Sequence, residues 1–182
     1  MDFDDYGLPH EYNCTASREQ PDSELSIRIP PVPLHESGDY VYVNVFPEDG
    51  RPWTAAVLRE GNGMLDAVTA TPEPVHACVV AGGVVYLIDT RDRDAWRRLD
   101  VVVPGMAAFG SPNDGLLLLA SFHKVFAVNA QLDVAWATDL DCDGIEFASV
   151  VNGILSVRAY MPGYGDWVSR AISLTDGTLL PD

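Results

Sequence analysis

The stretch "DLDCDGIEF", residues 139–147, contains the residue types of a metal site. Asp139, Asp141 and Asp143 alternate and a glycine follows, as in the first half of a calcium loop built from carboxylate oxygens. An EF-hand also needs a bidentate Glu at loop position 12, where this chain has Val150. The stretch also falls where a turn between two strands is expected, so we predict an acidic turn and no metal. The three aspartates are the candidate ligands of the alternative, a calcium-stabilised structural domain.

A second stretch, "AYMPGYGDW" at residues 159–167, has the residue types of a protein-binding site. Tyr160, Tyr164 and Trp167 surround a Pro-Gly hairpin loop, and Tyr and Trp are common anchors of protein interfaces. The same side chains would also suit a long hairpin whose aromatic rings cover a sheet edge. We predict that they contact a partner.

The stretch "RDRDAWRRLD", residues 91–100, concentrates four arginines around Trp96. Arginine forms bidentate pairs with carboxylates and phosphates, so this segment could hold an acidic group. The interleaved aspartates are expected to neutralise the arginines locally instead. Trp96 completes the predicted set of partner-binding residues.

Catalytic patterns are absent from the sequence, which has no GxSxG, HExxH, phosphate-loop or Rossmann glycine motif. We therefore predict no catalytic residue and no cofactor. His76 and His123 each lie in an expected strand, where Asp89 or Asp139 would supply a carboxylate partner. The alternative function is accordingly a hydrolase-like enzyme with an active site assembled from loops. Three cysteines without CxxC spacing indicate neither a zinc site nor a disulfide framework.

The net charge of −16 restricts the partners of this chain. Nucleic acids and anionic membranes bind proteins largely through Lys and Arg, so we expect neither as a partner. A basic protein would be attracted by the same charge. The N-terminus has no basic segment followed by an apolar one, so we expect a cytoplasmic protein. The oligomeric state is left open.

The elements that must position these residues are strands. Apolar alternation or short apolar runs, separated by Gly, Pro, Asn or Asp, predict strands at residues 40–46, 53–59, 64–70, 75–81, 84–89, 101–103, 116–122, 124–128, 134–137, 147–151, 154–160 and 167–174. Residues 92–100 are the best place for one short helix. We predict an all-β fold of antiparallel hairpins, in a small or incomplete β-propeller-like or β-sandwich arrangement, with at most that helix. Residues 1–24 are predicted to be a loosely attached acidic arm, and residues 25–182 a single domain.

Residues 83–182 resemble the repeats of quinoprotein-type (PQQ-like) β-propellers. A glycine leads into an apolar strand at Gly83, Gly115 and Gly153, and "LLLLASFHKVFAVNAQLDVAWATDL" at residues 116–140 contains Ala127, Asn129 and Trp136 at the repeat's positions. "SLTDGTLL", residues 173–180, is similar to the same turn in another copy. The glycine expected before the Trp strand is absent, and no cofactor motif is present. The resemblance implies blade-like hairpins and not a quinone cofactor.

Charge, aromatic hairpin and missing catalytic motifs together favour a non-catalytic, acidic protein-binding module. A bacterial inhibitor or immunity-type protein that neutralises a basic partner is the concrete form of this expectation.

Overall fold

The computed structural model describes residues 1–21, 24–31, 38–60, 65–103, 108–111 and 113–181, and every regular element among them is a strand. The first sheet has the order β2-β4-β5-β3 and contains β2 (Tyr12–Ser17), β4 (Tyr40–Pro47), β5 (Trp53–Leu58) and β3 (Ile27–Ile29). The second has the order β1-β6-β7-β8-β9 and contains β1 (Phe3–Asp4), β6 (Ala67–Ala70), β7 (His76–Ala81), β8 (Val84–Asp89) and β9 (Trp96–Val102).

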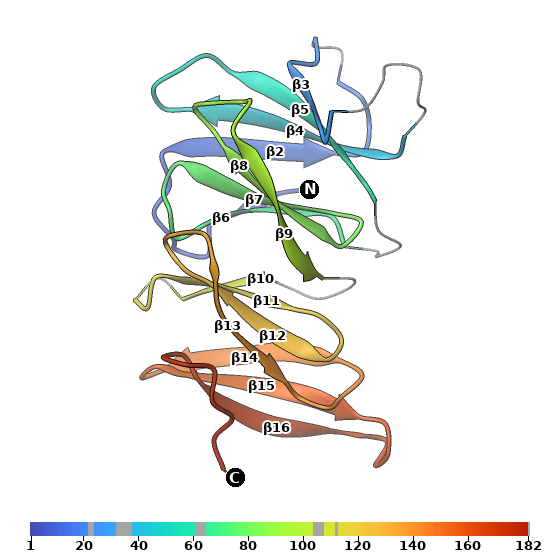
Figure 1. The fold of residues 1–182 in the computed structure, drawn as a ribbon, viewed down its shortest axis with the longest axis vertical. Coiled ribbons are helices and arrows are strands. Elements are labelled where there is room, and N and C mark those ends of the chain that lie inside the picture. The colour runs from blue at the N-terminus through green and yellow to red at the C-terminus, as the bar shows by residue number, and fades with distance from the viewer. Residues whose placement is uncertain (22–23, 32–37, 61–64, 104–107, 112, 182) are drawn as a thin grey trace.

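The third and fourth sheets are meanders of consecutive antiparallel strands. The third contains β10 (Ala108–Ser111), β11 (Leu116–Ala120), β12 (Lys124–Val128) and β13 (Val134–Asp139). The fourth contains β14 (Ile145–Val151), β15 (Ile154–Met161) and β16 (Asp166–Ser173). The four sheets are stacked in nearly their order along the chain, with the first and fourth at opposite ends (Figure 1). The arrangement is all-β and propeller-like.

Each pair of neighbouring sheets encloses one apolar core, and this explains the most apolar segments of the sequence. In β8, Tyr86 and Ile88 face the core shared with the first sheet, whereas Val85 and Leu87 face the core shared with the third. A strand buried on both faces has no solvent side, so it is a continuous apolar run rather than an alternating one. The "LLLLA" of β11 divides between two cores in the same way.

The fourth sheet is buried on one face only. Along β15, Leu155, Val157 and Ala159 are buried in the core against the third sheet, and the alternate residues face outward. Val151 at the end of β14 is 59% exposed and Ile154 at the start of β15 is 39% exposed. The outer face of this sheet therefore remains available to solvent or to a partner.

The structure differs from two of the predictions about local structure. The segment predicted as a short helix forms a turn followed by β9, because Leu99 and Val101 alternate into the core and Arg97 pairs with Leu87. Residues 3–17 supply β1 and β2 rather than a loosely attached arm, because Tyr12 and Cys14 alternate into the first core. The domain boundary at residue 25 stays a prediction.

Within the described residues, no helix has the length and hydropathy needed to cross a bilayer. The predicted strand at residues 64–70 is β6, although residue 64 lies outside the described part of the chain.

Candidate functional site

The two stretches singled out in the sequence, residues 139–147 and 159–167, lie side by side at one end of the fourth sheet. The backbone N–H of Asp143 donates to the Tyr160 carbonyl at 2.9 Å, and the Tyr160 N–H donates to the Gly144 carbonyl at 2.8 Å. These bonds extend the β14–β15 ladder into the turn that precedes β14. The acidic turn therefore ends beside the aromatic hairpin.

Two aromatic side chains of this hairpin form a tilted pair on the outer face of the fourth sheet. Tyr160 and Trp167 are cross-strand neighbours, with ring centroids 5.5 Å apart. The guanidinium carbon of Arg158 lies 5.2 Å from the centre of the Trp167 ring, and Glu146 holds that guanidinium at 2.9 Å. Tyr164 projects from the hairpin loop and is 82% exposed.

The carboxylates of the neighbouring turn are exposed and charged. The N–H of Asp141 donates to the Asp139 carboxylate at 3.1 Å and, with Lys124 3.5 Å away, lowers the pKa of Asp139 from its ordinary value of 3.8. Asp141 has a positive φ of 47°, which an Asp in a tight turn tolerates. His123 lies 3.7 Å from Asp143 and also contacts the Cys142 carbonyl through Nδ1.

We call the combined region the acidic–aromatic surface. It comprises Asp139, Asp141, Asp143, Arg158, Tyr160, Tyr164, Asp166 and Trp167. Three of the four predicted partner-binding residues belong to it. The fourth, Trp96, lies two sheets away on β9, where its ring packs 6.3 Å from that of Tyr86.

The predicted alternative for the acidic turn was a calcium site. Among the described residues, no three His, Cys, Asp or Glu side chains are arranged so that they could hold a metal ion. The Asp139 carboxylate faces a backbone N–H and a lysine, both of which compete with a cation. An acidic turn without a metal ion stays our prediction.

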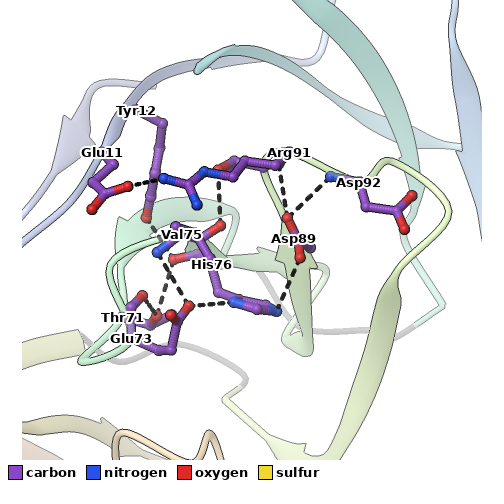
Figure 2. Close-up of polar contacts among 10 residues, drawn as sticks. Glu11, Tyr12, Thr71, Glu73, Val75, His76, Asp89, Arg91 and Asp92 are labelled. Carbon is purple, nitrogen blue, oxygen red and sulfur yellow. Dashed lines mark hydrogen bonds and ion pairs between the residues drawn. The ribbon is translucent and has the colours of Figure 1, made fainter. Parts of the chain in front are cut away.

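His76 is the centre of a second polar cluster, which Figure 2 shows between the first and second sheets. Its Nδ1 contacts the Glu73 carboxylate, and its Nε2 lies 4.0 Å from a carboxylate oxygen of Asp89, its cross-strand neighbour. The Tyr12 hydroxyl donates to the His76 carbonyl at 2.7 Å and so fixes the end of β7. Both ring nitrogens therefore face carboxylates.

The hydroxyl of Thr71 lies in this histidine cluster, but it donates to the backbone carbonyls of Glu73 and His76 rather than to the imidazole. The nearby Thr90 hydroxyl donates to the Val75 carbonyl at 2.8 Å. A pocket of about 250 Å³ adjoins His76 and includes Leu87, Arg97 and Leu132. A hydrolase-like role stays a hypothesis on this geometry, because acyl transfer would need an activated nucleophile beside the base.

Three of the four arginines in the arginine-rich segment form ion pairs, and their partners are carboxylates distant in the sequence rather than the segment's own aspartates. Arg91 pairs with Glu11, Arg97 with Asp133 and Arg98 with Glu60. Sequence spacing gave no sign of these partners, since each is brought close only by the packing of other strands or loops.

Comparisons with known proteins support the fold. No protein-family model and no curated protein sequence matches the chain. Among solved structures, it is similar to "Dihydro-heme d1 dehydrogenase NirN in complex with DHE", with 11% identity and a TM-score of 0.52 over 79% of this chain and 33% of that chain. The computationally designed Ika8 protein is 15% identical over 81% of this chain and 47% of that one, and its TM-score of 0.47 is too low to carry an argument.

The chain thus spans a third of the length of the NirN chain, which contains a β-propeller of the cytochrome d1 type. The likeness supports the propeller-type resemblance found in the sequence. It concerns the fold alone.

Proposed function

We propose that this chain is a non-catalytic protein-binding module that holds a basic protein on its acidic–aromatic surface. The proposal rests on one observation: an exposed acidic turn lies beside a cluster of Trp167, Tyr160 and Arg158. Trp, Tyr and Arg are the residues enriched at the energetic centres of protein interfaces. Carboxylates beside them select a cationic partner.

The distribution of ion pairs supports a basic partner. Within the described part of the chain, at least seven of the eleven Lys and Arg side chains form ion pairs with carboxylates. Because Asp and Glu total 27, most carboxylates have no cation of this chain to offset them. The surplus charge produces a negative field that accelerates encounter with a basic protein.

The surface offers two kinds of contact to a Lys or Arg of the partner. Asp141 and Asp143 provide exposed carboxylates for ion pairs, and the faces of Tyr160 and Trp167 provide cation–π contact. Tyr164 is an accessible anchor of large contact area and small rotamer entropy. Blocking the partner's own functional surface, as an inhibitor or immunity-type protein does, is the form of binding that we propose.

Affinity capture with variants tests this proposal. The tagged chain should capture a basic protein from a lysate of its source. Tyr164→Ala, or Asp141→Asn with Asp143→Asn, should weaken that complex about tenfold or more, the usual loss at an interface centre. Phe46→Ala is the matched control, because it removes an exposed aromatic ring from the first sheet instead. Equal capture by all the variants, or capture of acidic proteins only, would reject the proposal.

A further inference from the structure

A surface pocket beside the first and second sheets has three arginines in its lining. Its volume is about 390 Å³, within the range of small-molecule sites. These lining residues are Arg51, Arg91 and Arg93. The whole chain has only eleven Lys and Arg, against 27 Asp and Glu, so this gathering runs against the overall charge.

The ion pairing of these arginines differs from that of most other cations in the chain. Arg91 pairs with Glu11 at the surface. Neither Arg51 nor Arg93 has an ion pair or a side-chain hydrogen bond within the residues that the structure describes. In a chain with a large excess of carboxylates, two arginines that have no ion pair among the described residues thus line one pocket.

The pocket also has two acidic lining residues, Asp92 and Asp94, and one of them, Asp92, is hydrogen-bonded within the turn between β8 and β9. Asp92 accepts the N–H of Asp94 at 3.1 Å, while Asp89 accepts the N–H groups of Arg91 and Asp92 at 2.8 and 3.0 Å (Figure 2). These bonds fix the backbone of the turn that carries Arg91 and Arg93. The side chain of Asp94 is the remaining acidic group in the lining.

A second hollow of about 310 Å³ shares Ser26, Pro52 and Trp53 with the first and also includes Phe46 and one acidic residue, Glu24. Trp53 is held in place because its indole N–H donates to the Thr90 carbonyl at 2.9 Å. Phe46 is 43% exposed. Cations at one end and aromatic rings at the other suit a ligand with an anionic head and an apolar part.

We propose that this pocket binds a small amphipathic anion. Its phosphate or carboxylate group is held by Arg51 and Arg93, with Arg91 beside them, and its apolar part lies along Trp53 toward Phe46. Guanidinium forks bind both groups through paired N–H donors. The site is separate from the acidic–aromatic surface on the fourth sheet, so the two proposals succeed or fail independently.

Heteronuclear NMR of the full chain tests the proposal. Inorganic phosphate, succinate and phenyl phosphate are titrated while the Trp53 indole N–H and the Arg51 and Arg93 Nε–H signals are followed. Saturable shifts with phosphate, with succinate or with both are expected, and they identify the anion. Phenyl phosphate should bind more tightly than inorganic phosphate, and Phe46→Ala should remove that difference.

Paired variants decide the role of the arginines. Arg51→Gln with Arg93→Gln should weaken binding about tenfold or more, since each removes hydrogen bonds to a charged group. Lys124→Gln with Arg158→Gln removes the same charge from the third and fourth sheets and should leave binding unchanged. The proposal would be overturned if no anion caused saturable NMR shifts up to about 10 mM, because a dissociation constant above that concentration is too weak for a ligand site. An equal loss of anion affinity in both double variants would also overturn it.

Discussion

At the scale of single residues, Asp66 connects the first two sheets. Its side chain is 3% exposed and receives guanidinium groups from Arg18 and Arg59, both from the first sheet. The N–H of Gly82, in the turn between β7 and β8 of the second sheet, donates to the same carboxylate at 2.7 Å. Burial by itself would raise the pKa of Asp66, but these three donors together lower it from 3.8.

We predict that Asp66→Asn destabilises the protein by roughly 1.5–3 kcal/mol at pH 7, the range for hydrogen bonds to a charged group, because Arg59 keeps its pair with Asp39 and Arg18 is half exposed. A carboxyl group whose pKa is lowered by folding stabilises the folded state fully at a pH above its pKa in the unfolded state. That stabilisation is lost as the pH falls through its pKa in the folded state. The difference in unfolding free energy between wild type and Asp66→Asn should therefore shrink below about pH 4. Urea unfolding at pH 7 and pH 3 measures it.

Asp133→Asn is the control for this prediction, because it breaks an exposed pair with Arg97 and should cost no more than about 1 kcal/mol. The account of Asp66 would be wrong if both variants cost the same at pH 7, or if the Asp66 gap were equal at both pH values.

The acidic turn is the second case at this scale. We predict that millimolar calcium leaves the melting temperature nearly unchanged, because Asp139 already faces the Asp141 N–H and Lys124. A ligand at 100 times its dissociation constant would add about 2.7 kcal/mol, and each kcal/mol moves the midpoint by about 2–4 °C. Thermal scans of wild type and of Asp141→Asn with Asp143→Asn, with magnesium for comparison, measure this. A calcium-specific rise of several degrees that the double variant lacks would establish a metal site.

At the scale of elements, the sequence predicted strands well where the apolar pattern was strong. The runs of β8 and β11 and the alternation of β4 and β15 were assigned to strands, because both patterns reflect burial against neighbouring sheets. The sequence of β9 predicts a helix in part, because its charged residues mask the alternation of the two buried residues, Leu99 and Val101. β2 has no charged residue, but only one of its three inward residues is large, since Cys14 and Ala16 follow Tyr12, so its apolar alternation is weak.

The aromatic hairpin and the acidic turn were each found from residue type, but their adjacency was not. It depends on the pairing of β14 with β15, which joins residues 16 or 17 positions apart at Gly144, Asp143 and Tyr160. The separation of Trp96 from the other aromatic candidates, and the ion-pair partners of the arginines, also follow from sheet stacking. Residue spacing along one strand carries no information about which sheet comes next to it.

The Trp strand of the repeat makes a specific contact between the third and fourth sheets. The Trp136 indole N–H donates to the Leu174 carbonyl at 2.9 Å, and Thr138 donates to the Gly177 carbonyl at 2.5 Å. Gly177 has a φ of 74°, and a Cβ at this position would lie 2.8 Å from the Trp136 ring. Backbone conformation and packing both require glycine here.

We predict that Gly177→Ala costs more stability than Gly165→Ala. Both glycines have positive φ, which costs an L-residue roughly 1–2 kcal/mol, but a Cβ at Gly165 would meet nothing within 4 Å. Overpacking against Trp136 should add roughly 1–3 kcal/mol at Gly177. Urea denaturation of the two variants measures the difference, and equal costs would contradict the proposed docking of Trp136 on this turn.

At the scale of the whole molecule, the stack of four sheets separates two chemically different ends (Figure 1). The outer face of the first sheet has a hydrogen-bonded row of Thr15, Asn44 and Thr54 across three strands. The fourth sheet instead presents the acidic–aromatic surface. This face of the first sheet thus combines the polar row with the exposed ring of Phe46, which follows Asn44 by two residues on β4.

The central claim, that the acidic–aromatic surface binds a basic protein, is tested most directly by the binding kinetics of the captured partner. Association and dissociation rates are measured from low to high salt for wild type and Tyr164→Ala. The screening length falls from about 10 Å at 0.1 M to about 3 Å at 1 M, so the wild-type association rate should fall steeply while dissociation changes little. Tyr164→Ala should keep that salt dependence and dissociate about tenfold faster or more. A salt-independent association rate, or unchanged dissociation in Tyr164→Ala, would contradict the claim.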